Sequence, residues 1–267
     1  TVIPWDKYEE TYTTALNSGE GPDVGYMYNE MFPTYIDAGA VEDMSSYVTD
    51  EDKKEYKYLS NGNMMDGQYG WPLVTGVPFV LYYNEDILNA LGEKAPETWD
   101  DFARICQEAT KDTDGDGKVD QYGFACGMNT SDIGAMQILN AYYYSALWQN
   151  GGQVYNDDLK SVSFADEAGK EAVTWLKGLT SYMNEDFMSL SWSDAFSNVF
   201  GAGKAAFGIT RSSQTDGTTF AETYPDLNWN FVTSLKNKDF GTFGATDCLT
   251  LMSACEDKDL AMDFIKY

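Results

Sequence analysis

The sequence contains no histidine among its 267 residues. Hydrolytic sites in which histidine acts as the general base for a serine or cysteine nucleophile are therefore excluded. A zinc site would have to be built from sulfur and carboxylate ligands alone. Catalysis by a pair of carboxylates remains open.

Cysteine is scarce as well. The chain has four, Cys106, Cys126, Cys248 and Cys255, and no two of them form a Cys-x-x-Cys pair. Four are too few to staple a chain of this length by disulfides. We therefore predict free, buried thiols; if a disulfide did form, Cys106 and Cys126 would be the expected pair.

Basic residues are also few, since 17 lysines and arginines stand against 43 aspartates and glutamates, for a net charge of −26. This charge repels phosphate backbones and anionic lipid surfaces, which argues against nucleic-acid binding. It fits a solubilised exported protein. No apolar run reaches the roughly 20 residues that a membrane-spanning helix needs.

Aromatic residues, in contrast, make up 15% of the chain, with 19 tyrosines and 7 tryptophans. A core alone usually uses fewer, and amphipathic rings suit the apolar faces of sugars. A tyrosine-rich surface without a ligand is the alternative interpretation.

The stretch around residues 66–102 organises the chain. Residues 66–73 predict a turn into a short strand, and the β-branched and aromatic run 77–84 predicts a buried strand. Asn84 and Thr98, each followed by acidic residues, are typical of helix starts. Strands alternate with helical patterns along the rest of the chain, so we predict an α/β fold with largely parallel sheets covered on both faces.

The residues from Asp112 to Gln121 carry the most explicit chemical motif. Carboxylates at alternate positions, separated by glycines, let several oxygens converge on one hard cation such as calcium. The glutamate that closes a helix-loop-helix calcium site is missing, since Gly123 stands in its place. The predicted calcium ligands are Asp112, Asp114, Asp116, Lys118 through its carbonyl, Asp120 and Gln121. A surface turn without an ion is the alternative.

Several motifs together resemble the extracellular solute-binding proteins of ABC importers, of the maltose and oligosaccharide type. The resemblance spans nearly the whole chain and rests on the order and spacing of the motifs. They are Gly19-Glu-Gly-Pro-Asp-Val24, Asp66-Gly67 with Pro72, Tyr82-Tyr-Asn-Glu-Asp86, Pro96-Glu-Thr-Trp-Asp-Asp-Phe102, Phe200-Gly-Ala-Gly-Lys-Ala-Ala-Phe207 and Ala261-Met-Asp-Phe-Ile-Lys-Tyr267.

This resemblance implies a two-lobe periplasmic-binding-protein-like fold with a ligand cleft between the lobes. The first lobe would comprise residues 1–76 and 233–267, the second residues 77–232, and hinge motion would close them over the ligand. Family members extend past both ends, so a further strand is expected before Thr1 and further chain after Tyr267. The implied protein is a monomer, anchored outside the cell as a lipoprotein or periplasmic, which delivers a carbohydrate to a membrane permease.

The resemblance also implies where the sugar is held. Tyr28, Asn29 and Glu30 follow a predicted strand at its carboxyl end, where open α/β sheets place their ligands. A solvated helical turn is the alternative there, as core packing is for Trp192 and a surface salt bridge for Arg211. Rings would pack on the sugar while polar groups take its hydroxyls. The predicted ligand contacts are Tyr28, Asn29, Glu30, Thr75, Asn129, Trp192, Arg211, Ser212 and Asp247.

Two other functions are compatible with parts of this pattern. A glycoside hydrolase with a carboxylate pair suits an acidic, aromatic-rich chain without histidine, but no local acid pair can be placed in a shared cleft. A calcium-dependent adhesion module is a third reading, for which the chain is too rich in helix signals.

Overall fold

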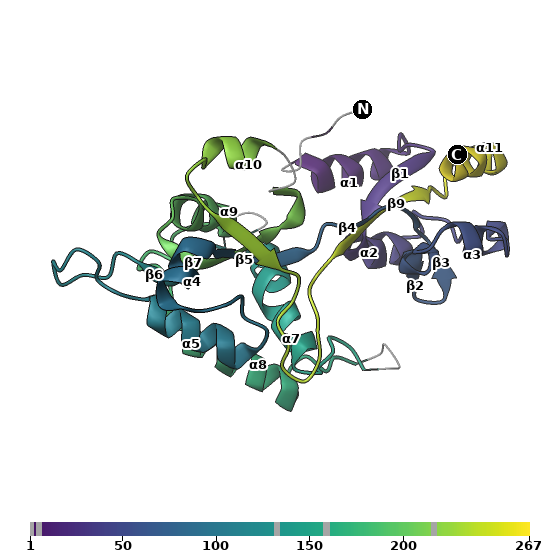
Figure 1. The fold of residues 1–267 in the computed structure, drawn as a ribbon. Helices are drawn as coiled ribbons and strands as arrows, with labels where there is room; N and C mark the ends of the chain where they lie inside the picture. Colours follow the sequence, from purple (N-terminus) through teal and green to yellow (C-terminus); the bar gives the residue numbers. More distant parts are fainter. Residues whose placement is uncertain (1–2, 4–6, 131–133, 157–160, 215–217) are drawn as a thin grey trace. The chain divides into compact units, whose positions relative to one another are not determined.

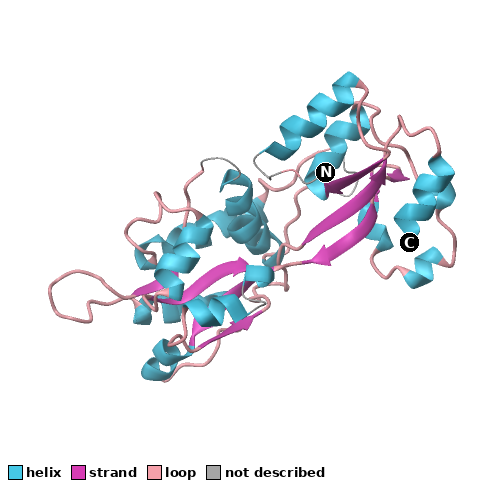
Figure 2. Cartoon of the chain, turned by 90° about the horizontal axis from the view of Figure 1, so that it is seen from above, coloured by secondary structure: helices cyan, strands magenta, loops and turns pink. Residues whose placement is uncertain are grey.

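The structure is a computed structural model that describes residue 3 and residues 7–130, 134–156, 161–214 and 218–267. It consists of two compact units. The first comprises Thr1–Gly76 and Gly244–Tyr267, and the second comprises Val77–Phe243. Each unit is a β-sheet flanked by helices (Figures 1 and 2), which confirms the α/β class.

The first unit contains a three-stranded sheet in the order β1-β9-β4 and a two-stranded hairpin, β2-β3. Its strands are β1 (Val24–Tyr28), β2 (Asn63–Met64), β3 (Gly67–Gln68), β4 (Trp71–Gly76) and β9 (Ala245–Leu251). Its helices are α1 (Tyr8–Ser18), α2 (Phe32–Asp37), α3 (Asp52–Glu55) and α11 (Lys258–Lys266). Cys248 of β9 packs into one hydrophobic cluster and Leu251 into another. Because odd and even positions of a strand face opposite ways, both faces of this sheet are buried.

The second unit contains a four-stranded sheet in the order β6-β7-β5-β8. Its strands are β5 (Phe79–Asn84), β6 (Tyr122–Ala125), β7 (Ala205–Arg211) and β8 (Trp229–Val232). Its helices are α4 (Glu85–Leu91), α5 (Trp99–Ala109), α6 (Gly134–Ile138), α7 (Ser145–Gln149), α8 (Glu167–Gly178), α9 (Trp192–Ala195) and α10 (Thr218–Thr223). Phe79 and Leu81 of β5 lie in one hydrophobic cluster, and Val80 and Tyr82 in another. This sheet is therefore also covered on both faces, as predicted.

The expectation of largely parallel sheets is wrong. In the first sheet β9 pairs antiparallel with both β1 and β4. In the second, β5 pairs antiparallel with both β7 and β8, while β6 and β7 are parallel. The alternation of strands with helices does predict the parallel relation of β1 to β4 and of β6 to β7. It fails at β5 and β9, because each follows the preceding strand without an intervening helix and is inserted antiparallel between strands of its new unit.

The second boundary between the units also differs from the expected one. The expected boundary lay after residue 232, whereas the segment 233–243 belongs to the second unit. Its backbone is bound there: Lys236 N–H donates to the Glu97 carbonyl (2.9 Å), and the Gln149 amide donates to the Gly241 carbonyl (2.8 Å). The polar composition of this segment does not predict that its backbone forms hydrogen bonds with the second unit.

Local signals for helix starts are confirmed. The Asn84 side chain accepts hydrogen bonds from the backbone N–H groups of residues 86 and 87 and caps α4. Thr98 and Asp101 form a reciprocal capping box at the start of α5. Between the two units the backbone is unusual, because Val77 has φ of +47°. A β-branched residue in this left-handed region is strained.

The four cysteines are free and buried, as predicted. Burial raises the pKa of Cys126 to about 12. Burial, together with the nearby Asp247 carboxylate, raises that of Cys248 to about 12 as well. None of the helices in the described residues is long and apolar enough to cross a membrane.

Candidate functional site

Three of the predicted residues meet at one end of the sheet of the first unit. Tyr28, the last residue of β1, lies opposite Asp247 of β9. On its other side Asp247 faces Val74 of β4, and Thr75 is the next residue of that strand. Strand register therefore brings Tyr28, Asp247 and Thr75 together at one sheet edge, although they are distant in sequence.

Tyrosine hydroxyls organise the carboxylates of this edge. The Tyr26 hydroxyl donates to Asp247 Oδ2 (2.6 Å), and the Tyr28 hydroxyl donates to Glu9 Oε1 of α1 (2.6 Å). Burial, and then the hydrogen bond to Glu9, raise the pKa of Tyr28. Tyr28 is therefore a neutral hydrogen-bond donor across the physiological pH range.

The turn that follows β1 presents a polar atom without a partner. Asn29 begins a 3₁₀ turn, and its side chain is half-buried. Among the described residues, no donor reaches its shielded Oδ1 atom. Leaving a buried acceptor unpaired costs roughly 1–3 kcal/mol, so a donor supplied by a ligand would be stabilising. Glu30, next to it, is exposed.

The second unit brings Arg211, Trp192 and Ser212 around the first residue of β5. Phe79 lies directly opposite Arg211 in the β5–β7 ladder. The Arg211 guanidinium lies 5.5 Å from the centroid of the Phe79 ring. The Trp192 ring stands edge-on to the same ring, at 5.7 Å and 77°. Ser212 N–H donates to the Pro78 carbonyl at 2.9 Å, so the chain after β7 is fixed to the start of β5.

Asn129 lies in the segment that follows β6, the parallel neighbour of β7. Its Nδ2 atom donates to the Ser189 carbonyl (3.0 Å), and its backbone N–H donates to the Leu190 carbonyl (2.9 Å). The carboxyl ends of the parallel strands β6 and β7 lie at one edge of the second sheet. This edge therefore carries Asn129, Arg211 and Ser212.

Sequence reasoning missed residues of the helical segment 134–149 that border this edge. Gln137 is 3% exposed, and its Oε1 accepts a hydrogen bond from Arg211 Nη2 (2.9 Å). Trp148, which is not among the predicted contacts, is half-buried and stacks on Phe243, whose ring in turn packs against Phe79. The stretch Leu139–Tyr144 is π-helical, with about one more residue per turn than an α-helix. The side chains after it therefore point in other directions than a regular α-helix would give them. Helical periodicity alone does not reveal such a shift.

The aspartate-rich loop projects from the second unit between α5 and β6 (Figure 1). It brings Asp112, Asp114 and Asp116 together, with one carboxylate oxygen of each within 4.8 Å of the others. Asp120 is not part of this carboxylate cluster. Both Asp120 oxygens accept hydrogen bonds from Thr113 (2.8 and 2.7 Å).

Two further hydrogen bonds hold Gln121 and Lys118 without using the oxygen atoms that are predicted to bind calcium. The Gln121 amide donates to the Ala109 carbonyl (2.7 Å), and Lys118 N–H donates to Asp116 Oδ1 (2.8 Å). Hydrogen bonds from the N–H groups of Gly117 and Gly115 lower the pKa of Asp112. This carboxyl is therefore ionised at neutral pH, as a calcium ligand must be.

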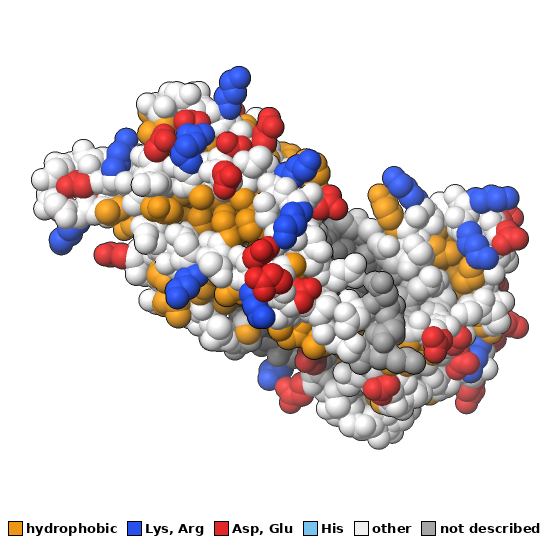
Figure 3. All heavy atoms as spheres, turned by 90° about the horizontal axis from the view of Figure 1, so that it is seen from below, with side chains coloured by type: hydrophobic (Ala, Val, Ile, Leu, Met, Phe, Trp, Pro, Cys, Tyr) orange, Lys and Arg blue, Asp and Glu red, His pale blue; other side chains and the backbone are white. Residues whose placement is uncertain are grey.

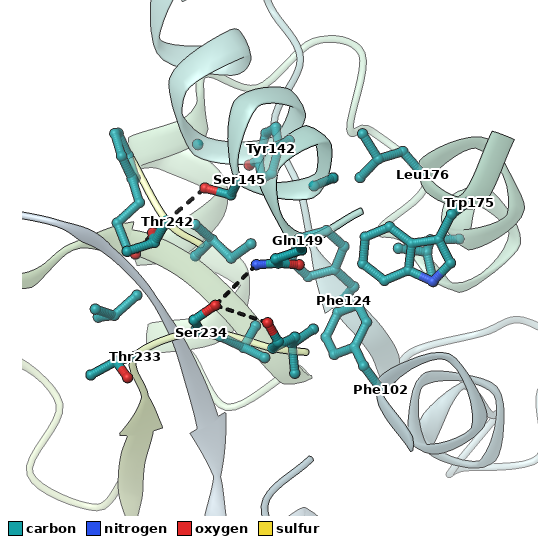
Figure 4. A pocket seen from close by; sticks show the side chains of 18 residues that line it. Phe102, Phe124, Tyr142, Ser145, Gln149, Trp175, Leu176, Thr233, Ser234 and Thr242 are labelled. Atoms are coloured by element: carbon teal, nitrogen blue, oxygen red, sulfur yellow. Dashed lines mark hydrogen bonds between the residues drawn. The ribbon is translucent and has the colours of Figure 1, made fainter. Parts of the chain in front are cut away.

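A cavity of about 40 Å³ lies within the core of the second unit (Figure 4). Aromatic rings such as Trp175 line one side, and Gln149 and Ser234 are hydrogen-bonded on the other. A water molecule needs about 10–15 Å³ of such a cavity, so this volume suits a few water molecules and is too small for a sugar. Its polar side instead holds the segment 233–243 in place.

Comparisons with known proteins agree with this architecture. A protein of Brucella abortus, described only as a binding protein, is 26% identical over 282 residues, which cover 99% of this chain and 63% of its own length. A solute-binding protein of an ABC transporter from Thermotoga lettingae, solved with α-D-tagatose, superposes with a TM-score of 0.74 at 19% identity, covering 98% of this chain and 66% of its own. An ABC substrate-binding protein of Listeria monocytogenes, in complex with cycloalternan, superposes with a TM-score of 0.73 at 20% sequence identity. The match covers 99% of this chain and 66% of that protein.

The chain thus spans about two thirds of the length of these proteins. The structures confirm the periplasmic-binding-protein-like fold. The family described as bacterial extracellular solute-binding protein matches residues 1–267. The chain belongs to the bacterial extracellular solute-binding protein family.

Proposed function

We propose that this protein is the solute-binding component of an ABC importer and that its solute is a carbohydrate, an oligosaccharide above all. Membership of the family supports solute binding. The structural neighbours solved with α-D-tagatose and cycloalternan support a carbohydrate. The protein works outside the cytoplasmic membrane, as a lipoprotein or in the periplasm, and acts as a monomer that delivers its cargo to membrane permease subunits.

The observation that carries the proposal is the sheet edge of the second unit. There the guanidinium of Arg211 and the indole of Trp192 both contact the ring of Phe79. Sugar rings present apolar C–H faces and polar hydroxyls at once, so they require aromatic and hydrogen-bonding groups side by side. The first unit supplies hydrogen-bonding groups at its own sheet edge, among them Asn29, whose Oδ1 atom has no partner among the described residues. We propose that both edges take part in carbohydrate binding.

Binding without catalysis is favoured over glycoside hydrolysis. A hydrolase needs one carboxylic acid whose pKa is raised so that it can donate a proton. In the described part of the chain, the carboxyl groups whose pKa departs from its ordinary value all have it lowered. These are Asp43, Asp52, Glu93, Asp101, Asp112, Asp120 and Glu171.

The surface charge also favours a small solute over a nucleic acid. Basic side chains are scattered singly among acidic ones on the face drawn in Figure 3. A nucleic acid requires basic groups clustered on one face to neutralise its phosphates.

The test is calorimetric titration of the protein with a panel of mono- and oligosaccharides, with product analysis after incubation. We expect binding without cleavage, and weaker binding in both Trp192→Ala and Glu30→Ala. The melting temperature of the free protein should be unchanged in Glu30→Ala and lower in Trp192→Ala, because the Trp192 ring packs against the core. Phe240→Ala and Glu10→Ala are matched controls, because each removes an exposed residue of the same type outside the two edges. Cleavage of a sugar would establish the hydrolase, and unchanged affinity in both edge variants would reject the site.

A further inference from the structure

Arg211 is one of two arginines in a chain of net charge −26. The other, Arg104, shows how such a protein normally uses a guanidinium. Arg104 is exposed on α5 and forms ion pairs with Glu93, Asp101 and Glu108. In the described part of the chain, no carboxylate forms an ion pair with Arg211. Its positive charge is thus not neutralised locally by a described residue, although acidic residues outnumber basic ones by more than two to one.

The group that holds Arg211 is neutral. Gln137 accepts from Arg211 Nη2 at 2.9 Å and is almost fully buried. Glutamine has the shape of glutamate without its charge, so it orients the guanidinium without neutralising it. The Phe79 ring, 5.5 Å from the guanidinium carbon, supports the group on its face through a cation–π contact. Together these contacts fix the plane of the guanidinium and leave its charge available.

A fixed guanidinium with unused N–H groups has a defined complement. It carries five N–H donors in a rigid fork that matches a carboxylate in bidentate fashion. Arg211 uses one of its terminal nitrogens for Gln137. The half-buried Trp192 contacts the same Phe79 ring and provides apolar surface at this end of β5. A ligand that satisfies both groups has a carboxylate attached to a ring with an apolar face.

We propose that the carbohydrate bound by this protein carries a carboxylate, as in a hexuronic acid or its oligomers, and that Arg211 is the residue that selects it. This inference rests on the proposed carbohydrate binding and names the class of sugar. The overall negative charge does not prevent it, because exposed charges more than about 8 Å away are largely screened at physiological salt. A ligand carboxylate bound by Arg211 would lie well within this distance of the guanidinium, which no described carboxylate neutralises.

The experiment compares sugars that differ only in the acidic group. D-galacturonate is titrated against D-galactose, and D-glucuronate against D-glucose, each pair as monosaccharides and as short homo-oligomers, by calorimetry at fixed salt. Hydrogen bonds to charged groups contribute enough that we expect the uronate of a pair to bind at least about tenfold more tightly. Arg211→Gln should remove this preference, and Arg211→Lys should retain part of it, because lysine keeps the charge without the fork.

Gln137→Glu provides an independent variant that leaves Arg211 in place. It sets a carboxylate where the neutral amide now holds the guanidinium, so it neutralises the charge and should also abolish the preference for uronates. Arg104→Gln is the matched control, since it removes the same charge on α5 and should leave the preference intact. A melting temperature for each variant shows that it is folded.

The outcomes separate the two proposals. A preference for uronates that is lost in Arg211→Gln and Gln137→Glu supports the inference. Binding of the neutral sugar as tightly as the uronate overturns it and leaves the proposed function standing. A uronate preference that persists in both variants also overturns the role of Arg211. Binding of neither class overturns the inference, and the sugar panel described above then decides the proposed function.

Discussion

At the scale of single residues, the clearest chemical consequence of the fold concerns its thiols. Cys106, Cys126 and Cys248 are fully shielded from solvent, and Cys255 is 6% exposed. Only the thiolate reacts with thiol reagents, and burial raises the pKa of Cys126 and Cys248 to about 12. These two groups therefore remain almost entirely protonated at pH 8, and reagents cannot reach them.

We predict that a chromogenic thiol reagent at pH 8 labels the native protein slowly. After denaturation without reductant, it should count four thiols within the dead time of mixing. A count of two in denaturant would reveal a disulfide that the structure does not contain. Rapid labelling of the native protein would contradict the burial.

Residues at the sheet edges also show what sequence alone could not provide. Tyr28, Asn29 and Arg211 could be proposed because each follows a recognisable strand. Gln137 could not be proposed from the sequence, because its role depends on Arg211, which is 74 residues away. Nor could the pairing of Tyr28 with Asp247, since strand register is decided by packing of both faces of the sheet rather than by local sequence.

At the scale of elements, the aspartate-rich loop offers a direct test of the calcium prediction. Asp112, Asp114 and Asp116 form the cluster, while Asp120 is bound to Thr113. Calcium that binds only the folded state stabilises it by about 2.7 kcal/mol at a hundredfold excess over its dissociation constant. We therefore predict that calcium raises the melting temperature and that a chelator reverses the rise.

Two variants define the ligand set. The double change Asp114→Asn with Asp116→Asn should abolish the response to calcium, because it removes two carboxylates of the cluster. Asp120→Asn should preserve most of it if the cluster alone binds the ion. If Asp120→Asn loses the calcium response to the same extent, the wider ligand set predicted from the sequence is supported. The absence of any calcium response in the unmodified protein would show that the loop is a surface turn.

Elements differed in how far sequence could predict them. The starts of α4 and α5 were predicted correctly, because Asn84 and Thr98 cap them through contacts within three residues. The directions of β5 and β9 were not, since they depend on which sheet a strand joins after the chain changes unit. Local chemistry determines a helix start, whereas strand direction is a property of the whole unit.

At the scale of the whole molecule, the excess of acidic residues should be measurable as a dependence of stability on salt. At 0.01 M salt charges interact over about 30 Å, and at 0.1 M over about 10 Å. A compact chain of net charge −26 repels itself more strongly than its expanded unfolded form. We predict that the melting temperature rises by several degrees between about 0.01 M and 0.1 M sodium chloride.

Tetramethylammonium chloride is the control for this effect, because its bulky cation screens charge without binding carboxylate clusters. An equal rise with both salts supports screening. A rise with sodium alone would point to ion binding at a site such as the aspartate-rich loop, and a fall with both would contradict the argument.

The order of the strands also has a consequence for how the protein is made. The second unit is a continuous segment of chain, whereas the first is completed only by residues after Phe243. Within the three-stranded sheet of the described residues, β9 lies between β1 and β4 and pairs with both. Because synthesis runs from the amino terminus, β1 and β4 leave the ribosome long before the strand that joins them. The second unit can fold as soon as it emerges, while the first must wait with both faces of its sheet exposed, which makes it the part of the nascent chain that most needs a chaperone.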